Sequence, residues 1–196
     1  MAEAVAARRS RITPEREAEL YEAVLDLVRE VGYEGLTMDA VAARTHSSKA
    51  TLYRQWGGKI QLVARALKHN QRGSVADIDT GSLRGDFHAM VARADDCQME
   101  SDALLLRSMA HAAYKDPELG QALRELFVEP ELKAFDDLLR RAVERGEVPA
   151  DHPALDYVIY MLAGVYNARE NIDGRPMDRA FLGAYVDAVI LPVLGV

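Results

Sequence analysis

The sequence has few of the residues that stabilise secreted or metal-binding domains. Its 196 residues include one cysteine, Cys97, so an internal disulfide is excluded. No cysteine and histidine pair has the spacing of zinc ligands. These absences are typical of a protein of the reducing cytoplasm, and we expect a cytoplasmic chain with no metal site and no cofactor.

Long hydrophobic runs are missing too. The longest interior uncharged stretch, Tyr157 to Ala168, is far shorter than the roughly 20 residues that cross a bilayer. The arginines near the N-terminus, Arg8, Arg9 and Arg11, are not followed by the apolar block of a secretory signal. The sequence therefore predicts neither a membrane span nor a membrane partner.

Motifs that carry catalysis are absent as well. The sequence has no glycine-rich phosphate loop, no His-Glu-x-x-His pair and no nucleophile elbow. We therefore expect no enzymatic activity and assign no catalytic residue.

Strand-like alternation and internal repeats are also lacking, whereas helical spacing runs through nearly the whole chain. The predicted fold class is therefore all-α. We expect helices at 14–31, 37–44, 48–56, from 59 onward, and at 83–97, 101–115, 117–146, 152–172 and 177–193.

The first expected helix has clear start and stop signals. Thr13-Pro14-Glu15 supplies a hydroxyl cap, a proline at the first helical position and an acid in the first turn. Gly32 ends the helix. Its predicted buried stripe consists of Leu20, Val24, Leu27, Val28 and Val31.

Charge is distributed unevenly along the chain. The net charge is −7, but residues 1–72 carry twelve basic and nine acidic side chains, a net charge of +3. Residues 73–196 carry twelve basic and 22 acidic side chains, a net charge of −10. Within 37–72, seven basic side chains accompany a single acid, which gives +6. Such a local basic surface indicates a partner that is a polyanion, although a merely solvated helix surface is the alternative.

The basic segment has the dimensions of a helix-turn-helix unit. The helices expected at 37–44 and 48–56 are joined by the turn 45–48. Leu52 and Trp56, four residues apart, predict which side of the second helix packs against its neighbours. The side chains left to face outward are of types that bind phosphates or bases in the major groove: Lys49, Thr51, Tyr53, Arg54 and Gln55.

The string GYEGLTMDAVA at 32–42, followed by SKATLYRQW at 48–56 and by Lys59, closely resembles the TetR family of transcriptional regulators. The resemblance covers about residues 14–62. It implies a three-helix helix-turn-helix DNA-binding domain joined to a larger C-terminal helical bundle for ligand binding and dimerisation. It also implies phosphate contacts from Thr37, Ser48, Thr51, Tyr53 and Lys59, and base reading or close approach by Lys49, Ala50, Arg54 and Gln55.

Three positions depart from the family pattern. His46 occupies the place of the usual turn glycine, where a left-handed backbone is less easy for histidine. Ser47 replaces an apolar residue that is usually buried, and Ile60 replaces an acid after Lys59. We expect the turn to be present, with altered details.

The resemblance also predicts the domain organisation. We expect a flexible basic arm at 1–13, a helix-turn-helix domain at 14–58, a connecting helix at 59–72, and a ligand-binding and dimerisation domain at 73–196. The arginines of the arm either contact DNA or belong to a disordered tail, and we prefer the second interpretation.

Effector contacts are expected on the apolar C-terminal helices, because ligand pockets combine apolar walls with a few directing groups. The polar, aromatic or flexible candidates are Met90, Met109, His111, Tyr114, Phe127, Tyr157, Tyr160 and Met161. Each of them fits a place in the core, on the surface or in an interface equally well.

The last two expected helices carry the predicted dimer interface. The stretch 157–168 is apolar on nearly all sides, which is typical of a helix buried against its own domain and against a partner. By resemblance, these two helices pair with their copies in a second subunit; burial within one subunit is the alternative. The predicted interface residues are Tyr166, Phe181, Ala184, Tyr185, Ala188 and Val189.

These patterns predict a homodimeric repressor that binds a palindromic double-stranded operator and is released by an unidentified small-molecule effector. An activator, or a regulator without a small-molecule effector, would have the same DNA-binding domain. A helical adaptor that binds protein instead of DNA is a further alternative.

Overall fold

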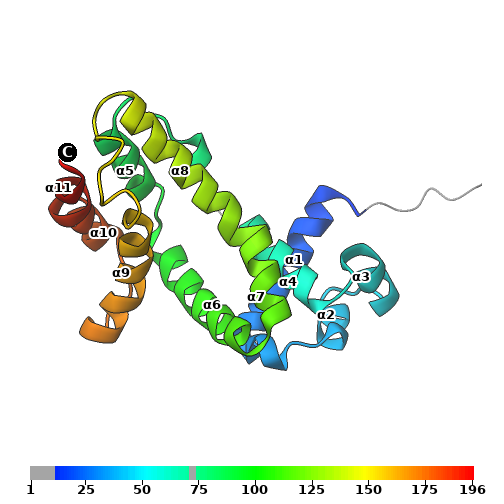
Figure 1. The fold of residues 1–196 in the computed structure, drawn as a ribbon. Helices are drawn as coiled ribbons and strands as arrows, with labels where there is room; N and C mark the ends of the chain where they lie inside the picture. Colours follow the sequence, from blue (N-terminus) through cyan, green and yellow to red (C-terminus); the bar gives the residue numbers. More distant parts are fainter. Residues whose placement is uncertain (1–11, 71–73) are drawn as a thin grey trace, which may run out of the picture.

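The computed structural model describes residues 12–70 and 74–196, apart from the side chains of Gln98 and Leu104 (Figure 1). Every regular element in these residues is helical. The N-terminal ones are α1 (Pro14–Gly35), α2 (Met38–Arg44), α3 (Lys49–Trp56) and α4 (Lys59–Asn70). The others are η1 (Val75–Asp77), α5 (Leu83–Ala92), α6 (Asp96–Lys115), α7 (Pro117–Leu123), η2 (Arg124–Val128), α8 (Glu129–Glu144), α9 (Val158–Asp173), α10 (Arg179–Tyr185), η3 (Val186–Ile190) and α11 (Leu191–Leu194). The arginines of the predicted arm lie outside the described residues.

Side-chain caps start the three helices of the N-terminal unit, as the sequence predicts. The hydroxyl of Thr13 accepts a hydrogen bond from the backbone N–H of Arg16 at 3.3 Å. Thr37 and Ser48 do the same for α2 and α3, each at 3.1 Å. These caps satisfy N–H groups that have no partner within their own helix.

Three predicted helix ends are wrong. α5 ends at Ala92 and α6 already begins at Asp96, because acidic residues at 95 and 96 favour a helix start there. α9 begins at Val158 rather than at 152, because the residues before it form consecutive turns. In these turns the N–H groups of residues 152, 155 and 157 bond to the carbonyls of residues 149, 152 and 154.

Two long C-terminal helices each contain a π turn that precedes a proline. The helix predicted at 117–146 runs through α7, η2 and α8, and the helix predicted at 177–193 runs through α10, η3 and α11. A proline ring clashes with the carbonyl four residues earlier. For Pro130 and Pro192 that carbonyl belongs to η2 and η3 respectively, so the wider π turns lie where room is needed.

The hydrophobic side chains form two cores. The proximal core combines α1–α4 with Leu105, Met109 and Ala112 of α6 and with Leu119 and Leu123 of α7. The distal core joins α5, α8, α9, α10, η3 and α11. Figure 1 places α3 and the group α9–α11 at opposite ends of the molecule, with α6 and α8 between them. The wall of the C-terminal bundle formed by α6 and α7 therefore belongs to the same core as the N-terminal helices.

The predicted stripe of α1 is confirmed except at one position. Leu20, Val24, Leu27 and Val28 are buried, but Val31 is 50% exposed. Gly32 has φ +71° and interrupts the regular helix, and Tyr33 turns inward in place of Val31.

None of the helices in the described part of the chain is long and apolar enough to cross a membrane.

Candidate nucleic-acid interface and effector pocket

One side of α3 is anchored firmly. Leu52 and Trp56 are buried, as their spacing predicts. The Trp56 indole N–H donates a hydrogen bond of 2.9 Å to the hydroxyl of Tyr21, and the two rings meet edge to face with centroids 6.0 Å apart. α3 is therefore held against α1 by a buried polar contact as well as by apolar packing.

The other side of α3 faces solvent. Tyr53 is 48% exposed, and Arg54 and Gln55 are exposed beside it. Lys49 is exposed too and lies 3.1 Å from the Asp39 carboxylate, a pairing weakened by water. The outward position predicted for these side chains is confirmed, with Thr51 half-buried and Ala50 exposed at the start of the helix. Their contacts with DNA remain a prediction.

The turn between α2 and α3 is present, as predicted, and contains the unusual residues His46 and Ser47. His46 has φ +50° and is the only non-glycine residue with a positive φ among the described residues. Thr45 is buried, and its hydroxyl donates to the Val41 carbonyl at 2.8 Å. The guanidinium of Arg16 donates to the Thr45 carbonyl from α1. These bonds stabilise the left-handed backbone conformation of His46, which is less favourable for histidine than for glycine.

Lys59 is engaged within the protein. Its ammonium donates to the carbonyls of Tyr33 at 2.9 Å and Leu36 at 3.1 Å, and it lies 4.1 Å from the centre of the Tyr33 ring. Burial lowers the pKa of Lys59, while the carboxylates of Asp116 and Glu34 act in the opposite direction. This lysine therefore ties α4 to the end of α1, and one N–H remains for the predicted phosphate contact.

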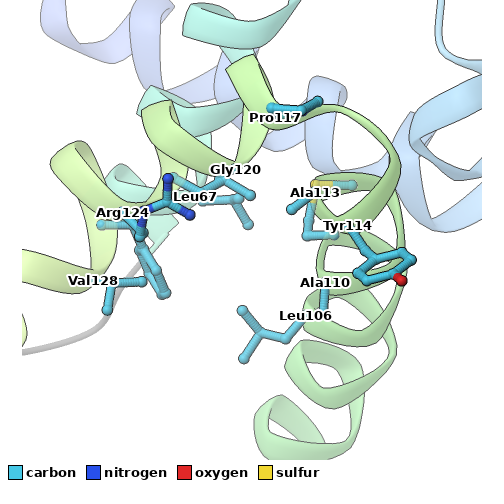
Figure 2. A pocket seen from close by; sticks show the side chains of 12 residues that line it. Leu67, Leu106, Ala110, Ala113, Tyr114, Pro117, Gly120, Arg124 and Val128 are labelled. Carbon is cyan, nitrogen blue, oxygen red and sulfur yellow. The ribbon is translucent and has the colours of Figure 1, made fainter.

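A cavity of about 630 Å³ lies where α4, α6, α7 and η2 meet (Figure 2). Leu67 contributes from α4, and Leu106 and Met109 contribute from α6. The opposite wall includes Arg124 and Phe127. Its volume and apolar walls are those of a small-molecule site, which typically occupies about 300–1,000 Å³.

The cavity includes three of the eight predicted ligand residues, Met109, Tyr114 and Phe127. The remaining five lie elsewhere. Met90 and Met161 pack against the distal core, Tyr157 and Tyr160 are exposed on or beside α9, and His111 is exposed on α6. The cavity residues that the sequence interpretation missed are Leu67, Leu106, Ala110, Ala113, Pro117, Gly120, Leu123, Arg124 and Val128.

Arg124 is the missed residue of greatest chemical interest. A signal for it was present, because Gly120, Leu123, Arg124 and Phe127 recur at helical spacing and only one of them is charged. Gly120 is buried at the contact of α7 with α6, and a Cβ added there would lie 3.2 Å from the Ala113 carbonyl oxygen. The absence of a side chain at 120 therefore permits the close approach of the two cavity walls.

α9 has one buried and one exposed side. Val158, Leu162 and Val165 face the distal core, whereas Tyr160 is 72% exposed and Tyr166 is 38% exposed. The predicted stripe of the last helix is only partly accessible. Ala184 and Ala188 are exposed and Val189 is half-buried, whereas Phe181 and Tyr185 are half-buried and pack against the distal core. These two elements lie at the end of the molecule opposite α3 (Figure 1), and their exposed side chains make the surface there partly apolar.

Two features define a helix-turn-helix DNA-binding protein. The N-terminal helices α1–α3 form a capped head whose helix α3 is basic and exposed, and the C-terminal helices form a larger body that shares the proximal core with this head. Residues 20–66 match the family described as bacterial regulatory proteins of the tetR family, and residues 77–189 match the tetracyclin repressor-like C-terminal domain. The chain belongs to the TetR family of helix-turn-helix transcriptional regulators. Members of this family are regulators rather than enzymes.

Individual relatives agree with this assignment. A protein of Mycobacteroides abscessus described as the DNA-binding transcriptional repressor TetR is 34% identical over 187 residues, which cover 91% of this chain and 94% of the relative. An uncharacterized HTH-type transcriptional regulator of Mycobacterium bovis is 34% identical over 182 residues, covering 91% and 88%. A crystal structure described as a TetR family transcription regulator has a TM-score of 0.66 at 28% identity and covers 93% of this chain and 98% of its own.

Proposed function

We propose that the protein is a homodimeric transcriptional repressor whose two α3 helices read a palindromic operator and whose DNA affinity falls when a small molecule enters the cavity. The observation that best supports DNA recognition is the exposed face of α3. Tyr53, Arg54 and Gln55 are exposed there together with Lys49, on a helix whose opposite side is buried. In this proposal the phosphates are held by Thr37, Ser48, Thr51, Tyr53 and Lys59, and Ala50 allows α3 to approach the bases. The relative described as a repressor supports the direction of control.

Dimerisation through α9 and α10–α11 is supported by the exposed apolar side chains there. Large aromatic residues such as Tyr160 and Tyr166 are typical anchors of protein interfaces. A twofold axis at this end would present two α3 helices to successive major grooves. The proposed interface uses the predicted residues Tyr166, Phe181, Ala184, Tyr185, Ala188 and Val189, and we add Tyr160 because it is exposed on the same helix as Tyr166.

The cavity is placed to influence the DNA-binding head. Leu67, Met109 and Leu123 line it and are also members of the proximal core. α4 packs against α1 on one side and against α7 and η2 on the other. A ligand that favours a different position of α4 would therefore shift the population of DNA-competent dimers, through its difference in affinity for the two states.

Operator selection from a random duplex pool, followed by fluorescence anisotropy at two salt concentrations, tests DNA reading by the full chain. Arg54→Ala is expected to weaken operator binding by about 5- to 150-fold and to relax preference at one base pair. Arg65→Ala in α4 removes the same charge from an exposed position off the α3 face and should have a much smaller effect. If salt-dependent binding to duplex DNA is absent, the result would instead support the protein-binding adaptor.

Sedimentation velocity tests the dimer independently. Tyr160→Asp is expected to convert dimer to monomer, because it buries a charge in an apolar contact. Tyr114→Asp, on α6 and 90% exposed, is the matched control and should leave the dimer intact. A monomeric wild-type chain would contradict the proposed assembly.

In a promoter-fusion assay, higher transcription in the presence of the protein would indicate an activator.

A further inference from the structure

The cavity between α6 and α7 has one charge in an otherwise apolar lining. Among the described residues that line it, Arg124 is the only charged one, and Tyr114 is the only other residue with a polar side chain. Tyr114 is 90% exposed, which places it at the rim. The interior walls are formed by aliphatic and aromatic groups, including Leu67, Met109 and Phe127.

Arg124 is available to a ligand. It forms no ion pair with any carboxylate in the described part of the chain. Its neighbour Glu125 accepts a hydrogen bond of 2.8 Å from Gln121 instead. Many other arginines of the C-terminal helices form ion pairs with carboxylates, such as Arg107 with Glu170 and Arg169 with Asp173.

The guanidinium lies on the cavity wall. Its Nη1 atom would be 3.5 Å from a Cβ at position 120, so it rests against the glycine face of α7. Figure 2 shows Arg124 on the wall formed by α7 and η2, across the cavity from Ala110 and Tyr114 on α6. The side chain is exposed, so its charge lies at the solvent-facing side of the cavity, with the apolar walls beyond it.

From this arrangement we infer that the effector is an amphipathic organic anion. Its carboxylate pairs with the Arg124 guanidinium, and its apolar body lies between α6 and η2 against Leu67, Leu106 and Phe127. A planar guanidinium with unused N–H donors is suited to bidentate carboxylate recognition. A cationic molecule would place its charge against Arg124, and a neutral one would leave the guanidinium without an added partner. This inference rests on the proposed function, since it names the chemical class of the effector.

Calorimetric titration of the full chain with decanoate, decan-1-ol and decylamine tests the charge requirement. Decanoate is expected to bind at least ten-fold more tightly than decan-1-ol, because a charged hydrogen bond contributes about 1.5–3 kcal/mol. Decylamine should bind more weakly than the alcohol. Shortening the chain from decanoate to octanoate should weaken binding about four-fold for each CH₂ removed, if the body is buried. Equal affinities for the acid and the alcohol would overturn the inference, and so would no binding by any of the three.

Variants separate the role of Arg124 from general effects on the fold. Arg124→Gln should abolish the preference for decanoate over decan-1-ol while retaining the alcohol affinity, and Arg124→Glu should favour decylamine. Lys133→Gln removes a charge from α8 at a residue outside the cavity lining and should keep the wild-type preference. Thermal melts of each variant verify that it is folded. A preference for decanoate that survives Arg124→Gln would contradict the assignment.

The failure of this inference can be told apart from the failure of the proposed function. If decanoate binds through Arg124 but operator affinity is unchanged, the anion site stands and the proposed release mechanism fails. If decan-1-ol releases the operator as well as decanoate does, release stands and the anion requirement fails. Both readouts use the same purified protein and the same selected operator.

Discussion

The Trp56 indole N–H donates a 2.9 Å hydrogen bond to the Tyr21 hydroxyl, and this buried pair joins α3 to α1. The Tyr21 hydroxyl in turn donates to Glu17 at 2.8 Å. Burial raises the pKa of Tyr21, while its hydrogen bond with Trp56 lowers it. The position of the proposed reading helix therefore depends on a short polar chain within an apolar core.

Tyr21→Phe is expected to lower the free energy of unfolding by about 1–3 kcal/mol, because it leaves the buried Trp56 N–H without its partner. Trp56 is the single tryptophan of the chain, so its fluorescence during urea unfolding reports this site directly. Tyr53→Phe removes an exposed hydroxyl from α3 and should change stability by less than about 0.5 kcal/mol. Equal stabilities of Tyr21→Phe and wild type would contradict the structural importance of the pair.

The left-handed residue His46 offers a test of backbone strain. His46→Gly is expected to raise the free energy of unfolding by about 0.5–1 kcal/mol, since glycine adopts φ +50° without a Cβ clash. His46→Val should lower it by about 1–2 kcal/mol, because a β-branched residue disfavours that conformation. Chemical denaturation measures both. A valine variant as stable as the glycine variant would show that the turn relaxes to another shape.

The buried carboxylate of Asp86 links α5 to the end of α8. The Asp86 carboxylate is fully buried, accepts two 2.7 Å bonds from the N–H and hydroxyl of Thr80, and lies 3.3 Å from an Arg145 nitrogen. Asp86→Ala is expected to cost about 1–3 kcal/mol, because the N–H and hydroxyl of Thr80 lose their buried acceptor, whereas Arg145 keeps its pairing with Glu147. Asp79→Ala is the control: its carboxylate also faces Arg145, at 3.7 Å, but is 62% exposed and should cost under about 1 kcal/mol. Thermal unfolding compares the two.

Alkaline pH should weaken the protein through Tyr33. Burial raises the pKa of Tyr33 to about 12, with a smaller contribution from the Asp116 carboxylate. In the unfolded chain the phenol loses its proton near pH 10, so the folded state binds more protons between pH 10 and 12. Stability contributed by this group is complete below about pH 10 and is lost as the pH rises towards 12.

Tyr33→Phe should therefore remove part of that alkaline loss, on the order of 1–2 kcal/mol after allowance for solvent screening. The measurement is urea unfolding of both proteins from neutral pH to about pH 11.5. Tyr53→Phe serves as the control because its ring is exposed, and its profile should follow the wild type. Parallel profiles for Tyr33→Phe and wild type would exclude Tyr33 as the cause.

Local signals in the sequence were sufficient for the DNA-binding unit. Thr13, Thr37 and Ser48 are caps whose bonding partners lie three residues away, and Leu52 and Trp56 lie on one side of a single helix. Capping and amphipathic spacing act over a few residues, so they can be recognised in the sequence without knowledge of the fold. The all-α fold class and the outward face of α3 were predicted correctly for this reason.

Other features were decided by tertiary packing. Lys59 bonds to carbonyls 26 and 23 residues earlier, and the proximal core recruits Met109 and Leu123 from the body. Arg124 lines a cavity only because α6 and α7 pack with a space between them. The free energy of such contacts depends on which distant groups meet, and helical spacing alone does not contain that information. The sequence by itself determined the helices and their exposed or buried sides, while the tertiary structure decided how the cavity and the DNA-binding head share one core.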